Sequence, residues 1–397
     1  MRLLFATSRL VMSSDDRRAA MDAIDRGVDW NRIVEVAEFH GCLPLVHRHI
    51  SAGAIPRPAV PEAIVERLDR GASAIARRNL LLTSELATIV REFDAHGIAV
   101  LPLKGPVLAQ SVYGSVALRR IRDLDILCSR DQVGGALDRL VARGYDATEP
   151  SLIRHLDRLH TSHHLALRSA DRRIRIELHF RLCSPFFSAP MELPSIAHRL
   201  VRVSLADTEL LALCPEDLLV YLCVHGSGHG WERLEWLCAV AELLRSNAVR
   251  DWDRVARWAD ELGVRRLVIS GAELATTLLG APVSYGSLGT DHRASRLASR
   301  VQSRLMHDPL SGERPIDLAR AALQTDATIR ARLARVWQAF VVPRANDMMA
   351  VPLPAALWPL YYIIRPLRLS SRFLFAARIR RSPRQVAVTR QRPATNA

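Results

Sequence analysis

Residues Ala99–Cys128 read AVLPLKGPVLAQSVYGSVALRRIRDLDILC. The apolar run that begins at Ile98 and ends at Leu103 predicts a buried strand. Lys104-Gly105-Pro106 ends that strand, because proline suits the first position of a helix, and the residues that follow have helical spacing. A second strand is predicted from Asp123 to Cys128. Asp123 and Asp125 are two residues apart on it, so their side chains point to the same face.

Two carboxylates on one strand face repel each other and need a compensating partner. A divalent cation is the simplest one, since Mg²⁺ takes oxygen ligands from carboxylates and substrate phosphates. The alternative is a solvated strand end, where aspartate is common. A third acid favours the cation. Residues 173–180, RIRIELHF, alternate between apolar and polar positions, which places Glu177 and His179 on the polar face of another strand. Glu177 could therefore complete a three-carboxylate metal site.

Lys104 is the only lysine among the 55 Lys and Arg residues of the chain. Lysine is a compact charge on a slim stem, suited to reaching a phosphate beside a helix N-terminus. We therefore predict a phosphate contact for Lys104, with the chance survival of one lysine as the alternative. Arg119, Arg120 and Arg122 come just before the two aspartates. They could neutralise these acids, or one of them, Arg119 first, could bind a phosphate through two hydrogen bonds.

This order of elements resembles that of the nucleotidyltransferases of the polymerase-β-like superfamily. More closely, the chain resembles the uncharacterised nucleotidyltransferase family proteins often encoded in bacterial biosynthetic clusters. The matching residues are Lys104-Gly105, Tyr113-Gly114, Arg119, Asp123-Leu124-Asp125-Ile126-Leu127, Gly144-Tyr145 and Glu177-Leu178-His179. The likeness extends to Trp30, to Arg78-Asn79-Leu80 and to residues 225–244. In two places the chain departs from the pattern: Ala239 stands where an aspartate is expected, and the turn is Lys-Gly where many superfamily members carry Gly-Ser. The first leaves the role of the downstream segment open, and the second leaves the choice of nucleotide open.

The resemblance implies an enzyme that moves a nucleoside monophosphate from an NTP, with ATP the first candidate, to a small-molecule or peptide acceptor. The cofactor that it implies is Mg²⁺ (or Mn²⁺). The implied site residues are Asp123, Asp125 and Glu177 for catalysis and metal binding, and Lys104, Gly105 and Arg119 for nucleotide binding. The alternative is a non-catalytic module that holds a nucleotide or a peptide on the same fold.

Strand patterns are confined to roughly residues 95–182, and helical periodicity fills both flanks. This predicts an α+β fold, with a small mixed-sheet nucleotidyltransferase core between N- and C-terminal helical regions. The expected parts are an N-terminal helical region (1–95), the core (96–185), a C-terminal helical domain (186–345) and a basic aromatic segment with a disordered tail (346–397). In the first part, the apolar positions from Leu80 to Phe93 are expected to face the sheet.

The composition favours a cytoplasmic protein with reduced cysteines. The six cysteines are scattered through apolar segments rather than arranged as a disulfide framework. No signal peptide or transmembrane segment is expected: the apolar run at residues 351–364 is short and contains three prolines.

The net charge is +14, and nine arginines without any acid lie from Arg365 onward. Such a tail could bind a membrane surface, RNA or an acidic partner. We instead expect a helix packed on the body of the protein, followed by a disordered tail, with nucleic acid the less favoured partner.

A zinc site could be considered further along the chain, because cysteine and histidine bind zinc and occur there as Cys223, His225, His229 and Cys238. Their spacing lacks the paired ligands of a structural zinc site. His225 and His229 could instead line a substrate pocket. The residues between and after them, 226–230, suggest a glycine-rich turn, but no strand precedes it, so it is a weak candidate for a phosphate loop.

Overall fold

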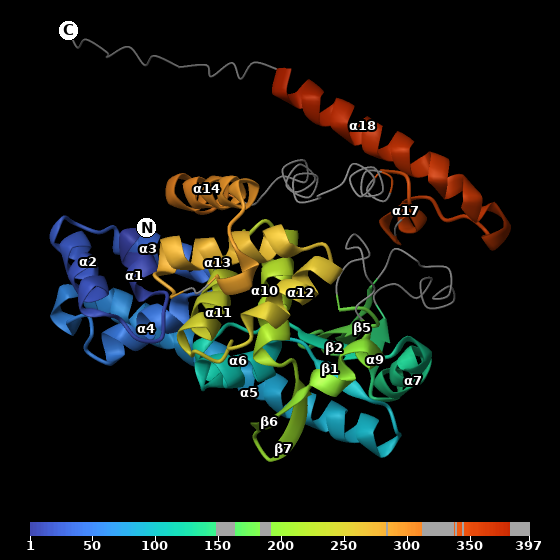
Figure 1. The fold of residues 1–397 in the computed structure, drawn as a ribbon, viewed down its shortest axis with the longest axis horizontal. Coiled ribbons are helices and arrows are strands. Elements are labelled where there is room, and N and C mark those ends of the chain that lie inside the picture. The colour runs from blue at the N-terminus through green and yellow to red at the C-terminus, as the bar shows by residue number, and fades with distance from the viewer. Residues whose placement is uncertain are drawn as a thin grey trace, which may run out of the picture. The chain divides into compact units, whose positions relative to one another are not determined.

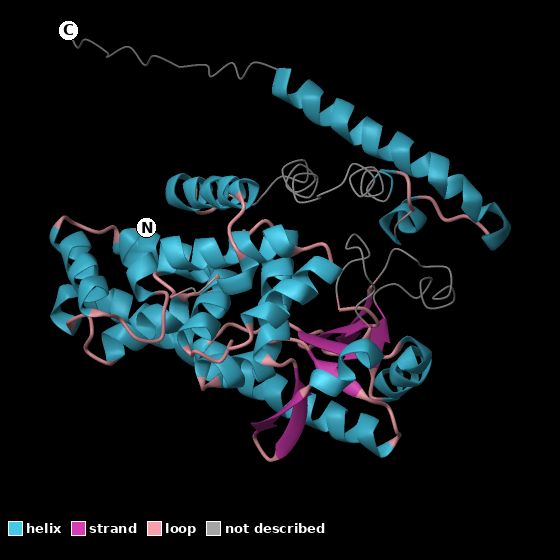
Figure 2. Cartoon of the chain, viewed as in Figure 1, coloured by secondary structure: helices cyan, strands magenta, loops and turns pink. Residues whose placement is uncertain are grey.

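The computed structural model describes residues 1–147, 163–182, 192–282, 285–311, 337, 340–343 and 345–381 of the 397-residue chain. The chain divides into two compact units, Met1–Arg335 and Val336–Ala397. The fold is α+β: a five-stranded mixed sheet and a separate hairpin lie within a mostly helical chain (Figures 1 and 2). This confirms the predicted fold class.

The five-stranded sheet has the order β1-β2-β5-β4-β3. Its strands are β1 (Val100–Pro102), β2 (Leu124–Cys128), β3 (Tyr145–Ala147), β4 (His164–Ser169) and β5 (Arg175–His179). The pair β2–β5 is parallel, and the other neighbouring pairs are antiparallel. β2, next to the central strand β5, is buried along its whole length, and its residues are apolar except for Asp125. The strands that carry the predicted acids are therefore neighbours at the centre of the sheet.

The turn between β1 and the helix α6 (Gly105–Tyr113) depends on one glycine. Gly105 opens the helix at φ +60°, a conformation that residues with a Cβ seldom adopt. α6 packs against both α5 (Glu62–Ala95) and α11 (Leu234–Arg245). The turn that carries Lys104 is thus held between the N- and C-terminal helices.

The N-terminal helices are α1 (Arg2–Thr7), α2 (Ser14–Asp25), α3 (Trp30–His40), α4 (Leu43–Ser51) and the 34-residue α5. α5 buries Leu82, Leu86, Ile89 and Phe93, as the apolar spacing predicts. The expectation that Leu80 and Leu81 also face inward is wrong, because these side chains are 60% and 45% exposed. Leu80 lies on the side of the helix opposite the buried stripe, and Leu81 lies on the flank of that stripe.

The second helical region follows the sheet. In the described residues of the first unit, its α-helices are α9 (Leu193–Ile196), α10 (Pro215–Gly228), α11, α12 (Trp252–Glu261), α13 (Arg265–Leu279) and α14 (His292–His307). One further helix, α7 (Val133–Ala142), comes earlier in the chain, between β2 and β3. α10, α11 and α13 pack on one another, and α14 packs on α13. Ten of the 14 residues of α10 are buried, so this helix lies at the centre of the region and brings its side chains close to the sheet.

A β-hairpin lies where only helices were expected. Strands β6 (Val201–Leu205) and β7 (Thr208–Ala212) pair antiparallel around a two-residue turn. Ala206 adopts φ +51° in that turn, which is the left-handed conformation that tight hairpins need. The alternation Val-Arg-Val-Ser-Leu was a strand signal in the sequence. The residues at the turn hid it, because Ala206-Asp207 is not a typical hairpin turn.

The second unit contains α17 (Ala345–Ala350) and α18 (Tyr361–Arg381). The buried Asp347 forms ion pairs with Arg365 and Arg368, and the Tyr361 hydroxyl donates a hydrogen bond to the Val351 carbonyl at 2.7 Å. Part of the arginine excess of this segment is thus used inside its own structure. Disorder was expected from about Arg381, and residues 382–397 lie outside the described residues.

Two further findings concern the helices and the cysteines. Among the described residues, no helix is both long and apolar enough to cross a membrane. The five cysteines in the described part of the chain are free and buried.

Candidate active site

The sheet register brings Asp125 and Glu177 together. In the parallel pair β2–β5, Asp125 is directly opposite Glu177, and Leu127 is opposite His179. Residues directly opposite each other in a sheet present their side chains to the same face. The Asp125 side chain is 4% exposed. Asp123 precedes the first residue of β2 and is partly buried. Asp125 and Glu177, which are 52 positions apart in sequence, are therefore neighbours in space.

Lys104 and His179 contact the Asp125 carboxylate. Lys104 Nζ lies 3.3 Å from one oxygen, and His179 Nε2 lies 3.2 Å from the other. Burial alone would raise the pKa of Asp125, but Lys104 and His179 outweigh this effect and hold that pKa well below its usual range. These two contacts therefore favour the ionised form of Asp125.

Asp123 is in the opposite electrostatic situation. Burial and the negative charges of Asp125 and Glu177 raise its pKa to about 6, against the smaller opposing effects of Lys104 and Arg175. The three carboxylates thus carry more negative charge than the surrounding cations compensate. An added cation would relieve this excess.

Glu177 is contacted by an arginine on one side and by histidines on the other. Arg175 donates a hydrogen bond to one carboxylate oxygen at 2.6 Å, and His179 Nε2 and His164 Nε2 lie 3.6 and 3.9 Å from the other. Burial would raise the pKa of Glu177, but the hydrogen bond from His179 and the charges of both histidines lower it overall. Glu177 is therefore also held in the ionised form, the form that ligates metals.

Histidines surround the acids on the sheet side. Burial and the positive charges of its histidine neighbours lower the pKa of His163 to about 2, and burial and His179 lower the pKa of His164 to about 4. For His179, burial would lower the pKa, but the hydrogen bonds to Asp125 and Glu177 raise it overall. The sequence analysis placed His179 on the polar face with Glu177 but gave it no role, and it did not single out His163 or His164. The period of two in residues 173–180 already indicated that His179 shares a face with Glu177.

Side chains of α10 and α11, and of the residue that follows α10, lie on the other side of Lys104. Lys104 Nζ lies 3.4 Å from both ring nitrogens of His225. His225 stacks edge-to-face with His229 one helical turn later, at 4.7 Å between ring centroids, and both rings contact the indole of Trp236. Burial and the charge of Lys104 lower the pKa of His225 and of His229. Neutral rings therefore line this side of Lys104.

The glycine-rich turn expected at residues 226–230 is instead mostly helix, because α10 continues through Gly228. Gly226 is needed for packing: a Cβ there would lie 2.3 Å from the Trp231 ring. Cys223 and Cys238 do not join the two histidines. Cys223 packs against Gly271, and Cys238 Sγ lies 3.9 Å from Cys42 Sγ.

Arg119 is a buried cation beside these groups. Arg119 is 8% exposed. The Asn79 side-chain amide donates a hydrogen bond to the Arg119 backbone carbonyl at 2.7 Å. Its Nε is buried without a hydrogen-bond partner in the part of the chain that the structure describes. The neighbouring arginines contact other groups: Arg120 donates to the Glu38 carbonyl, and Arg122 lies 3.2 Å from Glu235. Arg122 also has buried side-chain nitrogens without a hydrogen-bond partner among the described residues, but it is paired with Glu235. Arg119 therefore stays the first of the three arginines to consider for an anionic ligand.

The described residues contain two groups whose ligand atoms lie within 4.8 Å of one another: Asp125, Glu177 and His179, and His163, His164 and His179. The first group fits a hard cation, because Asp125 and Glu177 are ionised oxygen donors and the nearby Asp123 carries uncompensated charge. Asp123 is not a member of that group. It remains a predicted ligand, two residues before Asp125.

A family model described as "Uncharacterised nucleotidyltransferase" matches residues 26–280. The chain belongs to this family. The match spans α3 through α13 and therefore contains every group of the site described above. The family membership confirms the resemblance inferred from the sequence. Comparisons with curated proteins and with solved structures found no match.

The departure at Ala239 can now be placed in the fold. Ala239 is buried in the middle of α11, with Cys238 and Val240 buried beside it. A carboxylate at this position would need a buried partner. In this member of the nucleotidyltransferase family, that position is part of the hydrophobic core.

Proposed function

We propose that this nucleotidyltransferase family member is a metal-dependent enzyme that transfers a nucleoside monophosphate from an NTP, with ATP the first candidate, to a hydroxyl or amine of a small molecule or peptide. The observation that carries the proposal is the pairing of Asp125 with Glu177 on neighbouring strands of the sheet. Asp123 lies two residues before Asp125, and its burial and the charges of both acids raise its pKa. Three carboxylates with uncompensated charge favour a divalent cation, and the only lysine of the chain lies against them.

Asp123, Asp125 and Glu177 would hold Mg²⁺ or Mn²⁺. Bound there, the ion would supply a Lewis acid that neutralises charge on the triphosphate. Asp125 and Glu177 are suited to this role because their surroundings keep them ionised.

Lys104 and Arg119 would bind the phosphates. The Lys104 ammonium has three donors. It contacts Asp125 and His225, and we propose that it also contacts a phosphate oxygen of the bound NTP. Gly105 would offer its backbone N–H at the start of α6, where helix N-termini favour anions. Arg119 would stabilise the charge that develops on the leaving pyrophosphate.

The reaction forms one bond and breaks one. The acceptor oxygen or nitrogen attacks the α-phosphorus, the bond between that phosphorus and the bridging oxygen breaks, and pyrophosphate leaves with the electron pair. The acceptor loses a proton, which Glu177 would take if it is not occupied as a ligand. The pocket wall formed by His225, His229 and Trp236 lies next to Lys104, and the acceptor would enter along it.

The test combines binding and turnover in the full-length protein. Each of the four NTPs is titrated with and without Mg²⁺, and the protein is then incubated with an α-labelled NTP and a panel of acceptors. We expect Mg²⁺-dependent NTP binding and an acceptor whose mass rises by one nucleoside monophosphate. Asp125→Asn should remove both. Asp138→Asn is the matched control, since Asp138 is an exposed aspartate on α7.

The outcomes separate the proposal from its alternative. Mg²⁺-dependent binding without transfer to any acceptor, in a panel that includes peptides and small molecules, would favour a non-catalytic nucleotide-binding module. An absence of NTP binding under all conditions would contradict both.

A further inference from the structure

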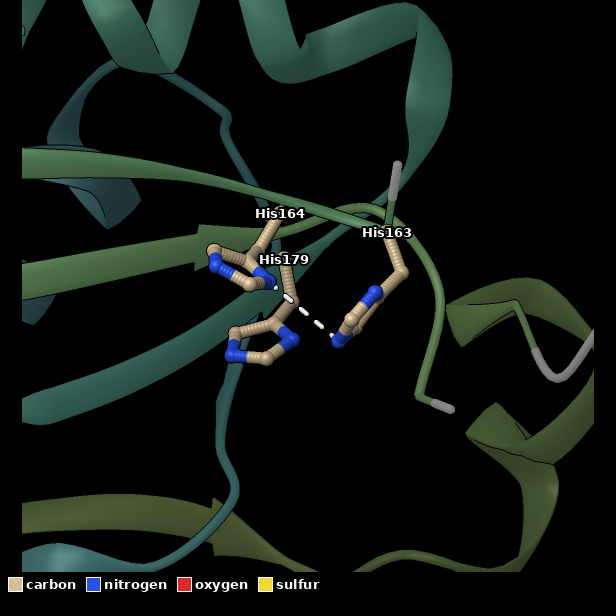
Figure 3. A group of neighbouring side chains, drawn as sticks. All are labelled: His163, His164 and His179. Atoms are coloured by element: carbon tan, nitrogen blue, oxygen red, sulfur yellow. Dashed lines mark hydrogen bonds between the residues drawn. The ribbon is translucent and has the colours of Figure 1, made fainter. Parts of the chain in front are cut away.

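Three imidazoles converge beside the carboxylates, at the ends of two neighbouring strands. His164 begins β4, His163 comes immediately before it, and His179 ends β5. The register of the antiparallel pair places His164 directly opposite His179. The ring centroids lie 4.5 Å apart for His163–His164, 5.1 Å for His164–His179 and 5.5 Å for His163–His179 (Figure 3). The convergence is thus built by the strand pairing.

The spacing of two of the nitrogens suits a shared metal ion. His163 Nε2 and His164 Nδ1 lie 3.2 Å apart and share a hydrogen bond in the absence of an ion, so a bound ion would replace that hydrogen bond. Two nitrogens bound to one tetrahedral zinc ion, each about 2.0–2.1 Å from the metal, are roughly 3.3 Å apart.

His179 offers the third nitrogen. Its Nε2 faces Asp125 and Glu177, whereas its Nδ1 is buried without a hydrogen-bond partner in the described part of the chain. A buried ring nitrogen without a partner costs free energy, so such an atom calls for a ligand. A metal-binding histidine commonly donates its other N–H to a carboxylate, and the contact from His179 to Asp125 has this arrangement.

We propose that His163, His164 and His179 form a binding site for Zn²⁺ or a similar transition-metal ion, with His163 Nε2, His164 Nδ1 and His179 Nδ1 as ligands. Nitrogen donors suit Zn²⁺, Co²⁺ and Ni²⁺, whereas Mg²⁺ and Mn²⁺ favour the oxygens of the carboxylates. The fourth position of the ion would be open to water or to a substrate group.

This site is separate from the proposed Mg²⁺ site, and His179 connects the two. A metal on Nδ1 fixes the proton of His179 on Nε2, where it is donated to Asp125. The ion would also join the start of β4 to the end of β5. The chain would therefore hold two ions of different chemistry on opposite sides of one histidine.

The experiment measures metal binding rather than activity. Full-length protein, stripped with a chelator, is titrated with Zn²⁺ by calorimetry and with Co²⁺ by its visible absorption. We expect one ion per chain and the stronger absorption of a four- or five-coordinate Co²⁺ ion. His163→Ala and His164→Ala should each weaken binding at least tenfold.

Two variants serve as controls. His198→Ala removes an exposed histidine that lies outside the cluster and should leave Zn²⁺ affinity unchanged. Asp123→Asn removes a predicted Mg²⁺ ligand that is not among the atoms of the histidine cluster, and it should also leave Zn²⁺ affinity unchanged while abolishing Mg²⁺-dependent NTP binding. The two proposals can therefore fail separately.

A measurement on the unmutated protein covers the case in which a variant does not fold. Zn²⁺ should protect the peptide that contains His163 and His164 from carbethoxylation, while His198 stays reactive. The inference is overturned if the unmutated protein binds no Zn²⁺ or Co²⁺, or if Zn²⁺ does not protect that peptide. It is also overturned if Glu177→Gln abolishes Zn²⁺ binding while His163→Ala and His164→Ala retain it, since the ion then lies on the carboxylates.

Discussion

Asp123 and Asp125 should respond in opposite ways to neutralisation. The sequence alone predicts repulsion between them, so that removing either charge would relieve strain. The structure distinguishes the two. Asp125 is contacted by Lys104 and His179, whereas Asp123 has its pKa raised by burial and by the neighbouring carboxylates. We expect Asp123→Asn to stabilise the metal-free protein and Asp125→Asn to destabilise it.

The magnitude for Asp123 follows from its pKa. The rise from the ordinary value of 3.8 to about 6 corresponds to about 3 kcal/mol, at about 1.4 kcal/mol per pH unit. Because the folded-state pKa lies above the unfolded-state value, ionisation of Asp123 lowers stability as the pH rises from about 4 to about 6. The advantage of Asp123→Asn should therefore grow over that range and stay constant above it. Asp125→Asn weakens a buried charged contact and should cost at least about 1.5 kcal/mol.

The assay is urea unfolding in the presence of a chelator, at pH 4.5 and pH 7.5, followed by tryptophan fluorescence. Asp138→Asn is the exposed control and should change the free energy of unfolding by less than about 0.5 kcal/mol. Both site variants should lose Mg²⁺-dependent NTP binding. The electrostatic argument is refuted if Asp123→Asn lowers stability at pH 7.5, or if its effect does not change between the two pH values.

Lys104→Ala should weaken NTP binding ten- to a hundredfold, because a charge-assisted phosphate contact is typically worth about 1.5–3 kcal/mol, and Lys104→Arg should weaken it less. Calorimetric titration with NTP measures both affinities, and full affinity in both variants would refute the phosphate contact. Burial lowers the pKa of His40 to about 4, so His40 binds a proton more readily in the unfolded chain, and the free energy of unfolding should fall by up to about 3 kcal/mol as the pH drops from 6.5 to 4. In His40→Asn, acid-denaturation curves should show a smaller fall of stability over this pH range. An unchanged fall would contradict the role of His40. Gly41→Ala should destabilise the protein more than Gly53→Ala, since both residues have φ +73° but only at Gly41 would the new Cβ meet the Glu235 side chain; thermal unfolding compares them, and equal losses would show that only the backbone conformation matters.

The sequence by itself determined which residue types the candidate site contains and on which local structures they lie. The period of two at residues 123–128 and 173–180 placed the carboxylates on strand faces, because side chains alternate along any strand whatever it packs against. Lys104-Gly105-Pro106 predicted a strand-to-helix turn, because the conformational limits of glycine and proline are local properties. These signals, with the resemblance that they support, were sufficient for the family and the fold class.

Only the tertiary structure decided which groups meet. The parallel register that pairs Asp125 with Glu177 depends on contacts between strands about 50 residues apart, and no local pattern records it. The placement of His225 on a buried helix next to Lys104 depends on how α10 packs. The hairpin at residues 201–212 escaped prediction because its turn residues are atypical. The difference between Asp123 and Asp125 has the same origin: both are aspartates on one stretch of chain, and their charges are set by distant neighbours that the fold brings to them.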